Sequence, residues 1–180
     1  MHRQIRFCGL GGQGIVLAGF ILGKACLEAG FNVTQTQSYG PEATGGASRS
    51  EVVISDSEID FPAVLAADIL VAMSQPGYDR YLKETAPDAL ILIDPHYVLN
   101  RTEGVFFVEA TKIAERVGTR LASNMVMTAV VSELVGLPHA ILQSAIIRTL
   151  SPSTHKINLA AIEEGFREGE RINRIVSGRN

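Results

Sequence analysis

The sequence predicts an α/β fold in three layers (α/β/α), with helices on both faces of a mostly parallel sheet, organised as one domain over residues 1–180. Three observations carry this prediction. Short apolar segments alternate along the chain with longer stretches of helical periodicity. The first apolar segment runs directly into a glycine-rich turn that opens a helix. No repeat, low-complexity tract or long linker divides the 180 residues, a length that suits one domain.

Strands are predicted where a short apolar or alternating run lies next to turn residues. They are Ile5–Cys8, Asn32–Gln37, Glu51–Ser55, Ile69–Met73, Ala89–Ile93 and Val105–Val108. In sheets of this class, ligands bind beyond the carboxyl ends of the strands. We therefore expect the glycine turn, the loop after the second strand, Ser74 and Asp94 to share one edge.

Helical patterns connect and follow these strands. The first, Ile15–Ala29, ends at Gly30, and another starts at Ser74 with a proline in its first turn. The remaining helices are predicted over Ala110–Val117, Asn124–Val135, Pro138–Thr149 and Lys156–Val176. Ile15–Ala29 and Asn124–Val135 are apolar on all sides, as in helices that are buried on all sides. Either a partner subunit covers one of them, or both lie inside the domain.

Composition excludes several classes of protein. Apolar residues make up 46% of the chain and charged residues 19%, which argues against disorder. The net charge of −3 without a basic block, and the absence of Trp, argue against nucleic acid as a partner. The longest apolar stretch is too short to span a bilayer, and no signal peptide is visible, so we expect no membrane association and a cytoplasmic location.

No residue pattern predicts a catalytic or metal site in the chain itself. Cys8 and Cys26 are isolated in apolar patterns, which indicates buried thiols and no iron–sulfur or zinc site. The four histidines are scattered and lack metal-ligand spacing. No Ser lies in a nucleophile-elbow pattern. We therefore predict no catalytic residue, no bound metal and no cofactor held by this chain alone.

The glycine turn is the first candidate site. It comprises Gly9, Gly11, Gly12, Gln13 and Gly14, and it fits G-x-G-x-x-G between a strand and a helix, which is Rossmann-like. A dinucleotide site also needs an acidic residue near the end of the second strand, and that segment has none. The turn could instead bind a phosphate at the helix N-terminus, with the Gln13 amide assisting, or simply permit close helix–strand packing.

The loop after the second strand, predicted over Ser38–Arg49, is the second candidate. Its glycines permit an unusual backbone path, and its proline, hydroxyl and charged side chains suit binding or docking better than an inert loop. The residues that we expect to bind a cofactor or dock a subunit here are Ser38, Tyr39, Gly40, Pro41, Glu42, Gly45, Gly46 and Ser48.

The two motifs together resemble the gamma subunit of the 2-oxoacid:ferredoxin oxidoreductases. G-x-G-G-Q-G stands at Gly9–Gly14 and S-Y-G-P-E-A-x-G-G-x-S at Ser38–Ser48. The segments Ile59–Pro62 and Asp68–Ser74, and Asn124-Met125 opening a late helix, also resemble the family, so the similarity covers nearly the whole chain. Many relatives have Arg where this chain has Thr44, which leaves the role of that arginine unfilled. The resemblance adds Asn124 to the candidate site.

This resemblance implies a non-catalytic subunit of a complex that oxidatively decarboxylates a 2-oxoacid, forms its acyl-coenzyme A and passes electrons to ferredoxin. It implies alpha, beta and possibly delta subunits as partners, with thiamine diphosphate, Mg²⁺ and iron–sulfur clusters in the complex. The substrate is expected to be 2-oxoglutarate, with pyruvate, branched-chain 2-oxoacids or indolepyruvate as alternatives. This chain would assemble and enclose the site and contact coenzyme A, and in isolation it could form a homo-oligomer.

Two readings outside that role also remain. The chain could be a stand-alone nucleotide-binding module, or a purely structural assembly subunit whose glycines only shape an interface.

Overall fold

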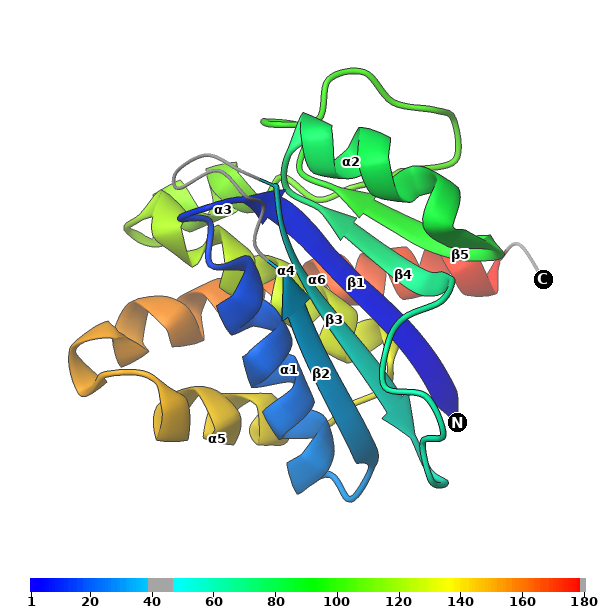
Figure 1. The fold of residues 1–180 in the computed structure, drawn as a ribbon. Helices are drawn as coiled ribbons and strands as arrows, with labels where there is room; N and C mark the ends of the chain where they lie inside the picture. Colours follow the sequence, from blue (N-terminus) through cyan, green and yellow to red (C-terminus); the bar gives the residue numbers. More distant parts are fainter. Residues whose placement is uncertain (39–46, 179–180) are drawn as a thin grey trace.

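A single sheet organises the fold. The computed structural model describes residues 1–38 and 47–178 of the chain. Within these residues, six strands form the sheet in the order β2-β3-β1-β4-β5-β6 (Figure 1). The strands are β1 (His2–Leu10), β2 (Asn32–Ser38), β3 (Ala47–Ser55), β4 (Ala67–Ala72), β5 (Thr85–Ile93) and β6 (Phe106–Phe107).

The sheet is mostly parallel, as predicted, with β3 reversed. The pairs β1–β4, β4–β5 and β5–β6 are parallel, whereas β3 is antiparallel to both β1 and β2. Because β3 runs antiparallel to both of its neighbours, β2 and β1 point in the same direction. The sequence patterns did not predict that β3 inserts between β1 and β2, because they contain no information on which strands become neighbours.

Helices cover both faces of the sheet, which confirms the three-layer prediction (Figure 1). Five helices share one apolar core with one face of the sheet, whereas α2 shares a separate core with the other face. The helices are α1 (Ile15–Glu28), α2 (Gln75–Tyr81), α3 (Ala110–Val117), α4 (Ser123–Leu134), α5 (His139–Thr149) and α6 (Pro152–Ser177). None of the helices described is both long and apolar enough to cross a membrane.

Some predicted boundaries were wrong. The predicted helix Lys156–Val176 begins earlier, at Pro152, because Pro at the first helical position suits the start of a helix. The predicted loop Ser38–Arg49 is shorter at both ends. Ser38 is the last residue of β2, and Ser48 and Arg49 belong to β3, where antiparallel pairing with β1 overrides their weak strand pattern.

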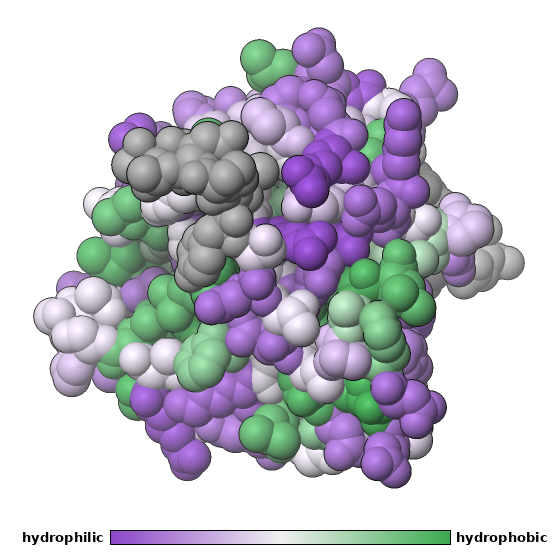
Figure 2. All heavy atoms as spheres, in the orientation of Figure 1, coloured by the Kyte–Doolittle hydropathy of each residue, from purple (hydrophilic) through white to green (hydrophobic). Residues whose placement is uncertain are grey.

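The two all-apolar helices have different surroundings. In α4, the residues from Ser123 to Ser132 are all buried, and the helix lies within the chain's own core. In α1, however, Phe20 is 48% and Leu27 is 64% exposed. Apolar and hydrophilic side chains are interspersed on the face seen in Figure 2. Deep burial therefore explains the composition of α4, but it does not explain that of α1.

Candidate functional site

The glycine turn joins the carboxyl end of β1 to α1 through two left-handed backbone positions. Gly12 has φ 91° and Gly14 has φ 71°, values that favour glycine. Gly14 is the N-cap residue of α1, and no side chain there bonds the first N–H groups of the helix. The first turn of α1 contains no acidic residue either. The positive end of the α1 dipole is therefore uncompensated at this turn.

Gln13 locks the turn onto the sheet. Its Oε1 accepts a hydrogen bond from the Leu10 N–H at 2.6 Å, and its Nε2 donates to the Met73 carbonyl at 2.8 Å. The amide therefore ties the end of β1 to the end of β4. The sequence suggested that this amide could serve a ligand, but the structure uses both of its polar atoms within the chain.

Asn124 supports the glycine turn from the start of α4. It is buried at the start of α4, and its Nδ2 donates to the Gly14 carbonyl at 3.1 Å. Its Oδ1 accepts from the Met125 N–H at 2.9 Å. A Cβ atom added to Gly14 would collide with the Asn124 amide. Close packing is thus one reason for glycine at position 14, and Asn124 positions the turn through its hydrogen bond to the Gly14 carbonyl.

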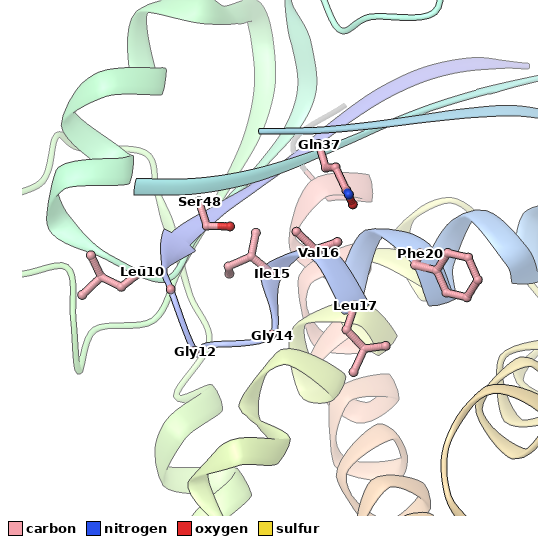
Figure 3. A pocket seen from close by; sticks show the side chains of 10 residues that line it. Leu10, Gly12, Gly14, Ile15, Val16, Leu17, Phe20, Gln37 and Ser48 are labelled. Atoms are coloured by element: carbon pink, nitrogen blue, oxygen red, sulfur yellow. The ribbon is translucent and has the colours of Figure 1, made fainter. Parts of the chain in front are cut away.

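A pocket of about 600 Å³ lies between the turn, the start of α1 and the strands β2 and β3 (Figure 3). Its apolar wall includes Leu10, Val16, Leu17 and Phe20. Ser48 points into it from β3, and the residue is only 4% exposed.

A second pocket of about 390 Å³ also adjoins the turn. It is lined by Gly11, Gly12, Gln13, Tyr97, Arg120, Leu121 and Ser123. The two pockets therefore share Gly11 and Gly12 in their linings. Arg120 and Leu121 are exposed at this rim, with Leu121 at 71%.

Two residues expected at this edge are present there but have structural roles. The Ser74 hydroxyl caps α2 by accepting from the Gly77 N–H at 3.2 Å. Asp94 is fully buried, and its Oδ2 accepts from the Thr111 N–H at 2.8 Å and from the Thr111 hydroxyl at 2.6 Å. The shared edge is confirmed, since the Asp94 N–H donates to the carbonyl of Ala72 at the end of β4.

The predicted site residues therefore divide into groups. The first pocket is lined by Gly11, Gly12, Gly14 and Ser48. The turn is supported by Gly9, the Gln13 amide and Asn124. At Gly9, an added Cβ atom would lie 2.7 Å from Ile15. Ser38 lies on β2, away from the pocket linings given above. The other predicted residues, Tyr39, Gly40, Pro41, Glu42, Gly45 and Gly46, lie outside the described residues, as does Thr44.

Sequence reasoning missed several pocket residues. Gln37, Phe20, Tyr97 and Arg120 line the two pockets but belong to no recognisable motif. The one available signal was Phe20, an aromatic residue on a helix that is apolar on all sides.

The two cysteines lie in different cores on opposite faces of the sheet. Cys8 packs with α2, and Cys26 packs with the helices of the larger core. Burial raises the pKa of each thiol to about 12, so both stay protonated near neutral pH. Among the described residues, no group of three His, Cys, Asp or Glu side chains is placed to hold a metal ion.

Comparison with known proteins gives consistent matches along the chain. Residues 4–168 match the family described as pyruvate ferredoxin/flavodoxin oxidoreductase. The chain is 42% identical over 177 residues to the 2-oxoglutarate synthase subunit KorC of Methanothermobacter marburgensis. The aligned region covers 92% of this chain and 95% of that protein. It is 38% identical over 180 residues to KorC of Methanocaldococcus jannaschii, with 96% of each chain covered.

A solved structure agrees in fold and in sequence. The keto/oxoacid ferredoxin oxidoreductase gamma subunit from Geobacter sulfurreducens superposes with a TM-score of 0.82 at 30% identity, covering 94% of this chain and 99% of that one. The family match and these relatives span nearly the whole length of the chain. The chain therefore belongs to the pyruvate ferredoxin/flavodoxin oxidoreductase family.

Proposed function

We propose that this chain is the gamma subunit of an oxidoreductase complex that decarboxylates 2-oxoglutarate, forms the acyl-coenzyme A and passes electrons to ferredoxin. The single observation that carries the proposal is the pocket at the uncapped N-terminus of α1, with the Ser48 side chain pointing into it. The choice of 2-oxoglutarate rests on the similarity to the KorC subunits.

Coenzyme A is the ligand that we propose for this pocket. The free N–H groups at the start of α1 and the helix dipole favour a phosphate group. The Ser48 hydroxyl can donate a further hydrogen bond to it. The apolar wall around Leu17 and Phe20 can cover uncharged parts of the ligand and keep water out. Bound coenzyme A would supply the thiol that accepts the acyl group.

The end of β2 argues against a stand-alone nucleotide module. In a dinucleotide site, an acidic side chain at that position binds the ribose hydroxyls. Here Gln35 and Gln37 occupy the end of β2, and the Gln35 amide already donates to the Ser50 hydroxyl at 3.0 Å. A ligand that is held by its phosphates at the helix fits this pocket better than one held by its ribose.

The redox chemistry belongs, in this proposal, to partner subunits. Cys8 and Cys26 lie on opposite faces of the sheet and cannot jointly ligate a cluster. Alpha, beta and possibly delta subunits would hold thiamine diphosphate, Mg²⁺ and the iron–sulfur clusters. Residues 1–180 would act as one domain in the cytoplasm. The glycine turn and the segment Ser38–Ser48 would bind coenzyme A or a neighbouring subunit, with Asn124 holding the turn in place.

The test is an assay of the assembled complex. The chain is co-expressed with its partner subunits, and ferredoxin reduction is measured with coenzyme A and each of 2-oxoglutarate, pyruvate, a branched-chain 2-oxoacid and indolepyruvate. We expect 2-oxoglutarate to give the highest kcat/KM. A clear preference for another 2-oxoacid would keep the subunit role and correct the substrate. Isolation of the chain without partners, together with thermal stabilisation by a nucleotide, would contradict the subunit role.

The pocket is tested within the same complex by Ser48→Ala. Loss of one hydrogen bond to a phosphate should raise the KM for coenzyme A by roughly fivefold to tenfold while the KM for 2-oxoglutarate stays unchanged. Ser153→Ala, at an exposed position of α6, is the matched control and should change neither constant. An unchanged KM for coenzyme A in Ser48→Ala would remove coenzyme A from this pocket.

A further inference from the structure

The two edges of the sheet are built differently. The β6 edge is only two residues long, and the Phe107 carbonyl accepts a hydrogen bond from Arg171 Nη2 at 2.7 Å. The Arg101 guanidinium covers the Phe107 ring at 4.6 Å from its centroid. Short length and covering charged side chains are common means of preventing an edge strand from pairing with another chain.

The β2 edge has none of these protections. The strand Asn32–Ser38 is seven residues long and pairs with β3 in unbroken register, without a bulge. It contains no charged residue and no proline. Each of its residues is at least partly exposed, and no strand among the described residues pairs with its outer side. A long, uncharged and regular edge is typical of a strand that pairs with another chain.

An exposed apolar stripe of α1 runs beside this edge. Phe20 and Leu27 are seven residues apart and therefore lie on the same face of the helix. They are 48% and 64% exposed. Phe20 lines the same pocket as Gln37 of β2, so the stripe begins next to the strand (Figure 3). A second chain that paired with β2 could bury apolar surface on α1 as well.

We propose that β2 pairs antiparallel with β2 of a second copy of this chain, about a twofold axis at Gln35. The three central residues, Thr34-Gln35-Thr36, are symmetric about Gln35. In this register, Gln35 lies opposite its own counterpart, and Thr34 lies opposite Thr36 of the other copy. Cross-strand Thr–Thr pairs are favourable, and the uncharged strand brings no repulsion between copies. The contact is self-complementary, as a twofold interface requires.

Charge placed at the axis gives the sharpest test. Gln35→Lys puts two ammonium groups opposite each other, and Gln35→Glu puts two carboxylates opposite each other. The mass of the full chain is measured by sedimentation equilibrium over a range of concentrations. We expect the unmodified chain to be a dimer, and each variant alone to dimerise with a Kd about tenfold weaker or more. Mixing the two variants should restore dimers, because opposite charges then meet.

Circular dichroism establishes that both variants are folded. Asp88→Lys, at an exposed position of β5, is the matched control and should leave the mass unchanged. A monomeric unmodified chain at every concentration would overturn the proposal. A dimer insensitive to both Gln35 variants, or variants that remain monomeric when mixed, would overturn it as well.

Discussion

Gly12 and Gly14 have the same left-handed backbone but different surroundings. A Cβ atom at Gly12 would meet nothing within 4 Å, whereas one at Gly14 would collide with the Asn124 amide. A side chain at Gly12 would therefore introduce backbone strain alone, whereas one at Gly14 would introduce both strain and a steric clash. The backbone term alone is about 1 to 2 kcal/mol for a residue with a side chain.

Gly14→Ala should consequently destabilise the chain more than Gly12→Ala does. We expect a loss of about 1 kcal/mol for Gly12→Ala from backbone strain. For Gly14→Ala we expect about 2 to 3 kcal/mol, because Asn124 must also move and lose its bond to the Gly14 carbonyl. Urea denaturation of both variants measures the difference. Equal losses would mean that Asn124 yields without resistance.

The thiols give a second prediction for single residues. Burial raises the pKa of Cys8 and of Cys26 to about 12, and both side chains are fully buried. The reactive thiolate is therefore scarce near about pH 8. A thiol reagent such as Ellman's should label neither cysteine in the folded chain and both after denaturation. Rapid labelling of a Cys26→Ala variant would show that Cys8 is accessible in the native state.

Two elements, β1 and β3, are held together by a buried ion pair at a register position. Arg6 and Glu51 lie opposite each other, and the Arg6 Nε donates to Glu51 Oε1 at 2.7 Å. Their side chains are only 2% and 4% exposed. Arg6 also donates to the carbonyl of Val64 at 3.0 Å and pairs with the Glu84 carboxylate at 2.9 Å. One guanidinium thus joins the sheet to two connecting segments.

Glu51→Gln tests this junction. It preserves shape but leaves Arg6 with less compensation for its buried charge, so we expect a loss of about 3 kcal/mol in the free energy of unfolding. Glu109→Gln is the control, because its partner Lys112 is 67% exposed and such pairs contribute less than about 1 kcal/mol. A loss for Glu51→Gln no larger than that of the control would mean that Glu84 alone compensates Arg6.

At the scale of the whole molecule, α4 is the central element of the larger core. The residues from Ser123 to Ser132 are buried, and α6 packs so closely on α4 that a Cβ atom at Gly165 would collide with the Val126 carbonyl. The 3₁₀ turn η1 (Leu82–Glu84), by contrast, has no buried residue. Local stability should differ accordingly between these segments.

Hydrogen exchange provides the measurement. We expect the amides of α4 to exchange only through global unfolding, with the same free energy as denaturant unfolding. The amides of η1 should exchange much faster, through local opening. Comparable rates in the two segments would contradict a core centred on α4.

Much of the fold could be predicted because periodicity is a local signal. The pattern in Ile15–Ala29 predicted α1 at close to its observed bounds, whereas Ile5–Cys8 marked only the centre of β1, which extends from His2 to Leu10 into the predicted turn. Ser74 and Asp94 were correctly expected at the ligand edge, but their roles as structural hydrogen-bond partners depend on Gly77 and Thr111. Such partners are identified only when the elements are placed together.

The sequence by itself determined the fold class, the glycine turn and the family to which the chain belongs, since these depend on local patterns and motif residues. Only the tertiary structure decided the insertion of β3 between β1 and β2, the two pockets that share Gly11 and Gly12, and the exposure of Phe20. The physical reason is that these features arise from contacts between distant segments. Gln13 meets Met73, and Gly14 meets Asn124, only because strand pairing and helix packing bring them together.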